Sequence, residues 1–228
     1  MSKIIDLTHT LSSEIPGWDL GCKFELETTV DYKDCTPPNL FRVQKINMLA
    51  QMGTHMDAPL HVIPGGTSID HIPVDQVAGE GVILDVHKAG PEPITARDLE
   101  KGNLRVQEGD LVFLWTGWGD KFSTPEYDPH PYLSEEAAGY LVEKKVKVVG
   151  LDVLTPDLPA PFRKEDYRGV VHETLLGNGV LIIENLGHLD EVAGKRLWIC
   201  AAPMKVRDGD AGFVRVLAFE KVPGIFPS

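Results

Sequence analysis

One stretch of eleven residues constrains this chain more than any other. It reads Gln-Met-Gly-Thr-His-Met-Asp-Ala-Pro-Leu-His and spans positions 51–61. Its side chains with metal-binding or proton-transfer chemistry are Gln51, His55, Asp57 and His61. All four positions are odd, and because side chains of an extended chain alternate between two faces, a strand-like segment turns them to one side. A helix does not explain this spacing, since Pro59 excludes a helix interior.

The residue types in this stretch suit a divalent transition metal. Imidazole nitrogens and carboxylate oxygens are common ligands of such ions, and Asp57 has two oxygens with which to bridge two ions. The alternative is a polar loop whose histidines and aspartate only satisfy backbone groups, which is the commoner case for an arbitrary segment of this composition. The residues alone leave both interpretations open.

The stretch resembles the signature His-x-Gly-Thr-His-x-Asp-x-Pro-x-His of the cyclase family of metal-dependent hydrolases, which includes bacterial kynurenine formamidase and isatin hydrolase. Every fixed position matches except the first, where this chain has Gln51. The run Gly-Asp-Leu-Val-Phe-Leu-Trp-Thr-Gly-Trp at 109–118 and Ala-Pro-Met-Lys at 202–205 are also similar to the family. The resemblance therefore covers nearly the whole chain.

A second group of residues extends the resemblance. The family pattern places a histidine and a glutamate twelve residues apart, and His172 with Glu184-Asn185-Leu186 matches it. A predicted helix at about 165–176 and a predicted strand at 180–184 form a tight hairpin, so the side chains of His172 and Glu184 can converge. Without the resemblance, a packed His172 and a solvated Glu184 are the commoner case.

The resemblance implies a role for each of these residues. Gln51, His55 and Asp57 contribute to a first metal, Asp57 and Glu184 bridge, and His172 completes a second metal. His61 is the general acid/base, since a histidine pKa of ~6.5 suits proton transfer to a leaving nitrogen. The expected reaction is hydrolysis of an amide-type C–N bond in a small molecule by a metal-activated water. The expected substrate is an aryl formamide such as N-formylkynurenine, or an isatin-like lactam.

Gln51 sets the expectation for the metal. Its amide oxygen is a neutral ligand and weaker than imidazole, which lowers affinity for zinc and favours manganese or magnesium. We therefore expect a divalent ion, Mn²⁺ or Zn²⁺, at one or two per chain, with manganese preferred or a single site well occupied. The alternative is that Gln51 does not bind metal and that the substrate differs from N-formylkynurenine.

Trp18 is the residue predicted to bind substrate. Kynurenine formamidases carry a substrate-contacting tryptophan just after a similar proline in this early loop, and Trp18 follows Pro16. The next residues, Asp-Leu-Gly at 19–21, depart from the expected Trp-Pro-Gly-Asp pattern. On the residues alone, a loop aromatic packed on the core is the commoner explanation.

Length, charge and cysteine content narrow the class of protein. A chain of 228 residues predicts one domain, 1–228, with a sizeable core. A net charge of −12 argues against nucleic acid or an anionic membrane as partner and leaves a small-molecule substrate. Three cysteines without a Cys-x-x-Cys pair exclude a Cys-rich zinc site and favour the reducing cytoplasm. Asp6 and His9 interrupt the only apolar run near the N-terminus, which argues against a signal peptide.

The hydrophobic pattern predicts a mixed α/β chain. Strands are expected at 3–8, 24–32, 41–50, 81–86, 110–116, 146–152 and 180–184, with two more across 197–220. Helices are expected at 96–101 behind a Thr95–Asp98 capping box, at 134–145 behind Ser134, and at about 165–176. The resemblance implies the swivelling β/β/α cyclase-like fold, with a mixed sheet or barrel-like core flanked by a few helices. It also implies a homodimer or tetramer.

Two other functions stay open. One is a catalytically weak metal- or ligand-binding protein on the same scaffold, which only Gln51 supports. The presence of His61 argues against it, because a binding protein has no need of an acid/base. The other is a hydrolase or cyclase that acts on another cyclic amide or lactone. Ring closure of a polyketide is a further interpretation that rests on the family's name alone.

Overall fold

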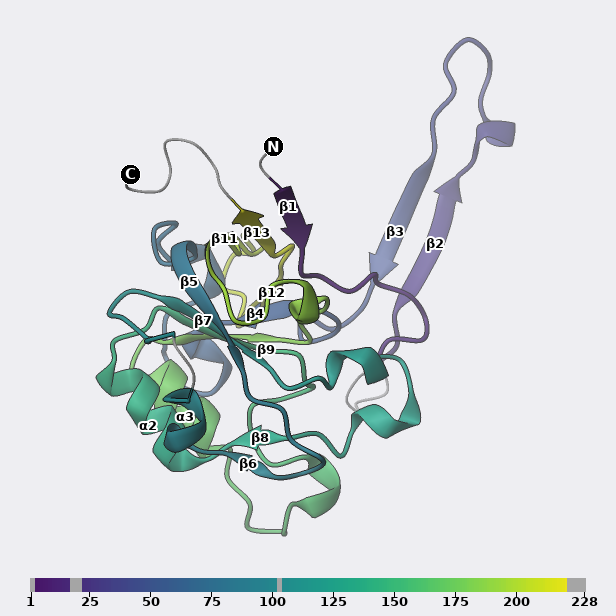
Figure 1. Cartoon of the computed structure of the whole chain (residues 1–228). Coiled ribbons are helices and arrows are strands. Elements are labelled where there is room, and N and C mark those ends of the chain that lie inside the picture. Colours follow the sequence, from purple (N-terminus) through teal and green to yellow (C-terminus); the bar gives the residue numbers. More distant parts are fainter. Residues whose placement is uncertain (1–2, 17–21, 102–103, 221–228) are drawn as a thin grey trace.

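The computed structural model describes residues 3–16, 22–101 and 104–220 and contains one strongly curled sheet of nine strands (Figure 1). At its centre four neighbours run parallel: β5 (Ala78–Asp85), β7 (Leu111–Trp115), β9 (Val148–Leu151) and β10 (Leu181–Glu184). The flanking strands pair antiparallel. Beyond β5 lie β11 (Arg196–Cys200), β13 (Leu217–Glu220) and β1 (Lys3–Asp6), and beyond β10 lie β4 (His55–Asp57) and β12 (Ala211–Phe213).

The central strands feed two separate hydrophobic cores. Val82, Val112, Val149 and Ile182 belong to the core on the helical side. Their chain neighbours Ile83, Phe113, Val148 and Ile183 belong to the core on the other face, around which the sheet curls. Because both faces are covered, these strands read as continuous apolar runs, as parallel strands usually do. The prediction of a mixed α/β fold with a barrel-like sheet is confirmed.

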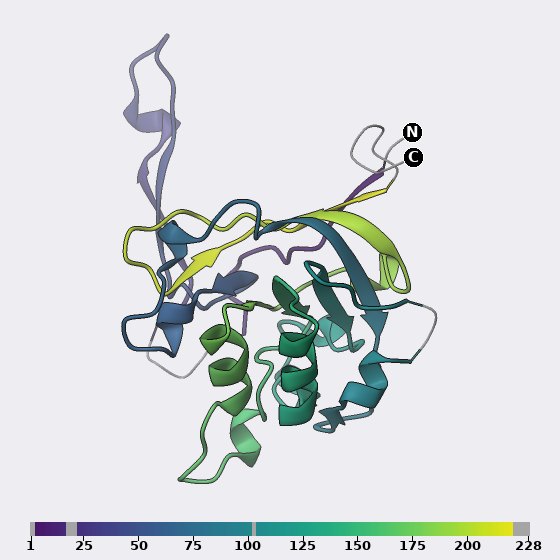
Figure 2. The same cartoon turned by 90° about the vertical axis from the view of Figure 1, so that its left-hand side faces the viewer.

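Three helices cover one face of the sheet: α1 (Ala96–Leu99), α2 (Glu135–Glu143) and α3 (Val170–Gly177) (Figure 2). Two predicted N-caps are confirmed. Thr95 and Asp98 form the capping box of α1, and the Ser134 hydroxyl accepts the Ala137 N–H at 3.1 Å. Among the helices of the described chain, none has the length and apolarity needed to cross a membrane.

The prediction for α3 is wrong at its N-terminal end, because the helix begins at Val170 and not near 165. The Asp157 carboxylate accepts the N–H groups of Val171 at 3.1 Å and His172 at 3.2 Å. A carboxylate in this place satisfies the free N–H groups of a first helical turn. The start of α3 is therefore fixed by Asp157, in the irregular segment that leads into the helix.

The prediction of two strands across 197–220 is also wrong, because this segment contributes three, β11, β12 and β13. The curled sheet is the reason. After β11 the chain crosses to the far edge, where β12 pairs with β4, and then returns to pair β13 with β1 and β11. Asp210, just before β12, is thereby brought beside the 51–61 segment.

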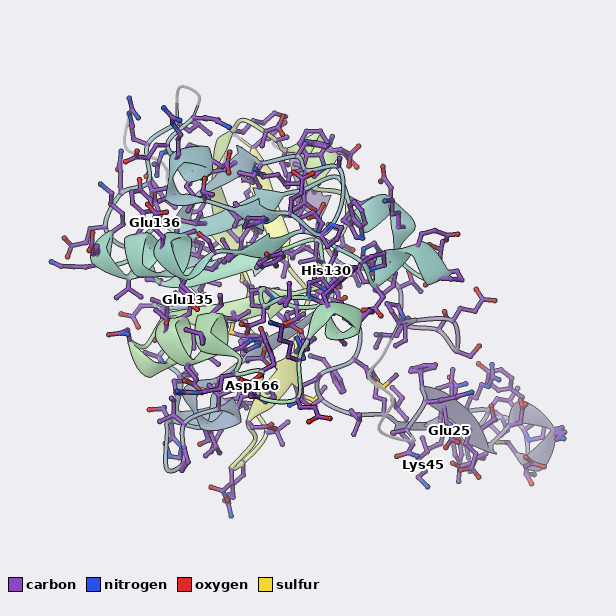
Figure 3. All side chains as sticks on the ribbon, turned by 90° about the horizontal axis from the view of Figure 1, so that it is seen from below. Glu25, Lys45, His130, Glu135, Glu136 and Asp166 are labelled. Carbon is purple, nitrogen blue, oxygen red and sulfur yellow. The ribbon has the colours of Figure 1, made fainter. Side chains whose placement is uncertain are left out.

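A separate two-stranded ribbon projects away from the body (Figures 1 and 2). It consists of β2 (Glu25–Val30) and β3 (Val43–Asn47), both at positions predicted as strands. Leu26 pairs with Ile46, and both side chains are more than half exposed. Glu27 pairs with Lys45, one position along. Since side chains alternate across a ribbon, the exposed Leu26–Ile46 pair lies on one face beside the polar Thr28–Gln44 pair, and Glu27–Lys45 lies on the other. Figure 3 shows Glu25 and Lys45 on this ribbon. A short parallel pair, β6 (Pro93–Ile94) and β8 (Tyr132–Leu133), completes the strands.

Candidate active site

Strands β4 and β10 place three candidate metal ligands on one face of the sheet. They are antiparallel neighbours in which Glu184 pairs with His55 and Ile182 pairs with Asp57. The three polar side chains point toward α3, while Met56 between the two signature residues enters the opposite core. All three polar side chains are buried.

Helix α3 adds His172 to this group. Its Nε2 lies 3.3 Å from Glu184 Oε1 and 3.7 Å from Asp57 Oδ2. From the other side, His55 Nε2 lies 3.4 Å from Glu184 Oε2 and 3.5 Å from Asp57 Oδ1. The two carboxylates therefore lie between two imidazoles. The helix–strand hairpin brings His172 and Glu184 together, as its short connection predicts.

The outer nitrogens of both imidazoles are held in place. His55 Nδ1 lies 2.9 Å from the carbonyl oxygen of Gly53, and His172 Nδ1 lies 2.5 Å from Asp157 Oδ2. Because these oxygens are hydrogen-bond acceptors, each Nδ1 carries the ring hydrogen. Each Nε2 then faces the Asp57 and Glu184 carboxylates. Metal-binding histidines are commonly oriented in this way by a second hydrogen-bond partner. Asp157 was missed by the sequence analysis, and no motif surrounds it.

Neighbouring charges shift the pKa values of His55, His172 and Asp57. Burial alone lowers the pKa of His55, but the Asp57 and Glu184 carboxylates outweigh it and raise that pKa to about 10. Burial also disfavours the charged form of His172, yet Asp157, Asp57 and Glu184 raise its pKa well above the ordinary value. The pKa of Asp57 is held far below its usual range by the two histidines despite burial. The site is thus built to hold positive charge.

These residues fit a divalent ion. His55 Nε2 and both carboxylate oxygens of Asp57 are buried without a hydrogen-bond partner, which is costly unless a cation satisfies them. The ligand atoms of His55, Asp57 and Glu184 all lie within 4.8 Å of one another, and so do those of Asp57, His61 and His172. Two groups that share Asp57 suit one ion or a bridged pair. Nitrogen and oxygen donors suit zinc or manganese.

The prediction that positions 51–61 form one extended run is wrong on both sides of β4, because residues 51–54 form a turn and bend with Gly53 at φ 63°. Ala58 is extended, but Pro59 begins a 3-10 turn, Pro59–His61, whose first position its fixed φ favours. The turn still directs His61 to the site. Its ring centroid lies 5.8 Å from that of His172.

Asp210 is a second residue that the sequence analysis missed. Gln51 Nε2 donates to Asp210 Oδ2 at 2.7 Å, and His61 Nδ1 lies 3.1 Å from the same oxygen. Asp210 precedes β12, and the Ala58 N–H donates to its carbonyl at 2.9 Å. The hydrogen bond occupies the amide nitrogen of Gln51 and not its oxygen, which is the atom that would bind a metal. Metal binding by Gln51 therefore stays a prediction.

A cavity of about 580 Å³ opens over this cluster, a volume typical of small-molecule sites. It is lined by Leu49, Gln51, His61, Val62, Thr155, Asp157, Arg163, Tyr167, Gly169, His172, Glu184 and Asp210. Of the predicted ligands, Gln51, His172 and Glu184 thus line the same cavity as the predicted acid/base His61. Trp18, the predicted substrate contact, lies outside the described residues.

Comparison with known proteins identifies the family. Residues 5–158 match the family described as "Putative cyclase". This chain belongs to the cyclase family. The resemblance to this family that the sequence indicates is confirmed.

Full-length relatives of this cyclase-family chain are known. A kynurenine formamidase of Erythrobacter litoralis (strain HTCC2594) is 30% identical over 220 residues, which are 96% of this chain and 94% of that protein. A solved structure described as a "potential metal-dependent hydrolase with cyclase activity" is 29% identical with a TM-score of 0.77, covering 98% of this chain and 100% of the other. Isatin hydrolase A from Labrenzia aggregata, bound to benzyl benzoate, is 26% identical with a TM-score of 0.82, covering 96% and 93%.

Proposed function

We propose that this cyclase-family protein is a metal-dependent hydrolase that cleaves an amide-type C–N bond of a small molecule. The proposed substrate is an aryl formamide such as N-formylkynurenine, or an isatin-like lactam. The observation that carries the proposal is the pair of carboxylates, Asp57 and Glu184, held between two imidazoles beside a cavity of about 580 Å³. The formamidase and isatin hydrolase names of its relatives support the reaction class.

His55, Asp57, Glu184 and His172 are the proposed metal ligands, with the amide oxygen of Gln51 completing the first ion. The unpartnered buried atoms of His55 and Asp57 support this assignment. We propose Mn²⁺ or Zn²⁺, at one or two per chain, with manganese favoured by the neutral amide ligand. When bound, such an ion lowers the pKa of water from ~15.7 to ~7 and polarises a carbonyl.

His61 is the proposed general acid/base. Its Nδ1 lies beside Asp210, which leaves Nε2 as the nitrogen that takes a proton from the attacking water and delivers it to the leaving nitrogen. Asp157 keeps the His172 ring oriented through Nδ1. Trp18 is proposed as an aromatic wall for the substrate.

We further propose a homo-oligomer in the cytoplasm. The exposed Leu26–Ile46 pair of the β2–β3 ribbon supports self-association, because an isolated two-stranded ribbon is marginally stable in water unless it packs against another surface. Three unpaired cysteines, Cys22, Cys35 and Cys200, support a reducing compartment.

The test is hydrolysis by metal-stripped protein to which Mn²⁺ or Zn²⁺ is added back. N-formylkynurenine and isatin are followed by absorbance. We expect turnover of one of them only after metal addition, and the more effective ion identifies the cofactor. If neither compound is hydrolysed with either ion, the proposed substrate class is overturned.

A further inference from the structure

We propose that Asn185 is a positioning residue of the metal site, because it fixes the Gly53 carbonyl that orients His55. Tyr127 in turn holds the Asn185 side chain. The inference rests on the proposed metal-dependent function and deepens it. Asn185 and Tyr127 are both almost fully buried and lie behind the ligands, outside the lining of the active-site cavity.

The Gly53 peptide group needs an outside partner to fix its direction. Gly53 has a φ of 63°, in the left-handed region that glycine adopts without strain. It precedes β4, whose pairing with both neighbouring strands begins only at His55. Because glycine lets the adjoining peptide groups rotate at little cost, the direction of its carbonyl depends on the donors that it meets.

Asn185 supplies one of these donors. Its Nδ2 donates to the Gly53 carbonyl oxygen at 3.0 Å, and the same oxygen lies 2.9 Å from His55 Nδ1. A carbonyl oxygen has two lone pairs, so the two donors occupy both of them. The carbonyl holds the hydrogen of the His55 ring on Nδ1, which leaves Nε2 available to a metal ion. Partners of this kind commonly orient metal-binding histidines.

The backbone of Asn185 ties the two ligand-bearing strands together. Asn185 directly follows Glu184, the last residue of β10, and its φ of 57° lies in the left-handed region that asparagine tolerates. Its carbonyl accepts the Thr54 hydroxyl at 2.6 Å. Side chains thereby continue the pairing of β4 with β10 by one step beyond the Glu184–His55 pair. The contact fixes the ends of both strands where their ligands lie.

Tyr127 fixes the direction of the Asn185 amide. Its hydroxyl donates to Asn185 Oδ1 at 2.9 Å, so the amide nitrogen faces the Gly53 carbonyl. The tyrosine is itself held, since Trp118 Nε1 donates to its carbonyl at 2.8 Å and Phe122 meets its ring edge-on at 5.5 Å. Trp118 ends the family run at 109–118, so this run supports the metal site through Tyr127.

The experiment compares metal binding by wild type, Asn185→Gly, Tyr127→Phe and the double variant. Asn185→Gly keeps the left-handed backbone and removes only the side-chain amide. The matched control is Lys145→Gly, because Lys145 has a φ of 54° and pairs with Glu108 on the surface. Tyr140→Phe controls for loss of a tyrosine hydroxyl, from helix α2.

Two measurements on metal-stripped protein avoid any dependence on turnover. Competition with a chromophoric chelator gives the dissociation constants of Zn²⁺ and Mn²⁺. The visible absorption spectrum after Co²⁺ addition reports the ligands around the ion. Melting temperatures of the metal-free variants measure the purely structural effect of each change.

We expect Asn185→Gly to raise the dissociation constants by about 10-fold, the lower end of the range for groups that orient metal ligands. The Co²⁺ spectrum should change, because the His55 ring is no longer held toward the ion. Tyr127→Phe should have a smaller effect. The double variant should bind metal no more weakly than Asn185→Gly, since both changes act through one amide. Lys145→Gly and Tyr140→Phe should leave affinity and spectrum unchanged.

Metal affinity and a Co²⁺ spectrum that equal those of wild type in Asn185→Gly would overturn the inference. A lower melting temperature of the metal-free variant would not rescue it, because Asn185 would then support the fold alone. Additive losses in the double variant would overturn the link from Tyr127 to Asn185.

The same measurements separate this inference from the proposed function. If Asn185→Gly weakens metal binding as expected but wild type hydrolyses no amide, the proposed function is overturned and the positioning role is retained. If wild type hydrolyses an amide and Asn185→Gly binds metal normally, the function is retained and the positioning role is overturned. If wild type binds none of the three ions, both are overturned.

Discussion

Two cavities in this molecule contain a pair of histidines, and the surroundings of the pairs are opposite. The active-site cavity presents His61 and His172, and a second cavity of about 260 Å³ presents His9 and His188. In the first, carboxylates raise the pKa of His172 well above its ordinary value. In the second, burial and the neighbouring His188 lower the pKa of His9 to about 4. One cavity stabilises an imidazolium or a cation, and the other stabilises a neutral ring.

The second cavity also has acidic residues, so acid content alone does not explain the difference. Both oxygens of its buried Asp152 already have hydrogen-bond donors. One oxygen accepts the Thr116 N–H at 3.0 Å and the Thr116 hydroxyl at 2.6 Å, and the other accepts the Gly117 N–H at 3.1 Å. His9 stacks flat on Phe122 with ring centroids 3.9 Å apart. In the active site, by contrast, both Asp57 oxygens are buried without a partner. The two cavities therefore differ in whether the carboxylate beside the histidines already has hydrogen-bond partners: Asp152 has them and Asp57 does not.

Replacing the shared carboxylate should have the largest effect. Asp57→Asn removes the charge between His55 and His172, so we expect metal content to fall sharply and kcat/KM to drop by at least about 10³-fold. Elemental analysis and the formamidase assay measure both. His188→Asn is the matched control in the second cavity. It should leave metal and activity unchanged, because asparagine tolerates the left-handed backbone at φ 54°. Loss of metal in His188→Asn would show that the second cavity also affects metal binding, and would contradict the difference between the two cavities.

His61→Ala separates the acid/base from the ligands. We expect kcat to fall by about 10²- to 10⁴-fold, the usual contribution of acid–base catalysis, while bound metal is retained. Metal content and single-turnover rates test this. Concurrent loss of metal would instead make His61 a ligand, in the group it forms with Asp57 and His172.

Asp210→Ala should have a smaller effect. Its carboxylate lies beside His61 Nδ1 and accepts from Gln51, so its loss leaves the ring free to rotate. We expect kcat to fall by about 10- to 100-fold with KM and metal content nearly constant, the range for a residue that orients a catalytic group. Asp210→Asn, which keeps an accepting oxygen, should recover part of the rate. Full activity in Asp210→Ala would show that His61 needs no such support.

The sequence predicted the parts of the site that local pattern encodes. His55 and Asp57 alternate on a strand inside a long signature, and His172 and Glu184 lie across one short hairpin. Asp210 is 159 residues from Gln51, and only the curl that pairs β12 with β4 brings it there. Asp157 comes from a loop without periodicity and meets His172 through tertiary packing. Local pattern holds no information on such contacts.

The same limit applies to the fold. Alternation located β2 and β3 correctly, but it does not distinguish a strand that packs on the body from one that projects from it. The turn at Pro59 was missed because a proline that holds its predecessor extended also favours a turn at its own position. Strand and helix positions are therefore encoded locally, whereas their partners depend on the curl of the sheet.

The second cavity gives the smallest predicted effect, on stability and not on activity. The pKa of His9 is lowered from 6.5 to about 4 in the folded protein, so the unfolded chain takes up this proton first as the pH falls. Stability is therefore lost between pH ~6.5 and ~4, by roughly 3 kcal/mol at most. His9→Gln should flatten this part of the urea midpoint against pH, whereas replacing the exposed His71 by glutamine should not. An unchanged slope in His9→Gln would mean that the ring takes up its proton in the folded state, and the contrast between the two cavities would then rest on their carboxylates alone.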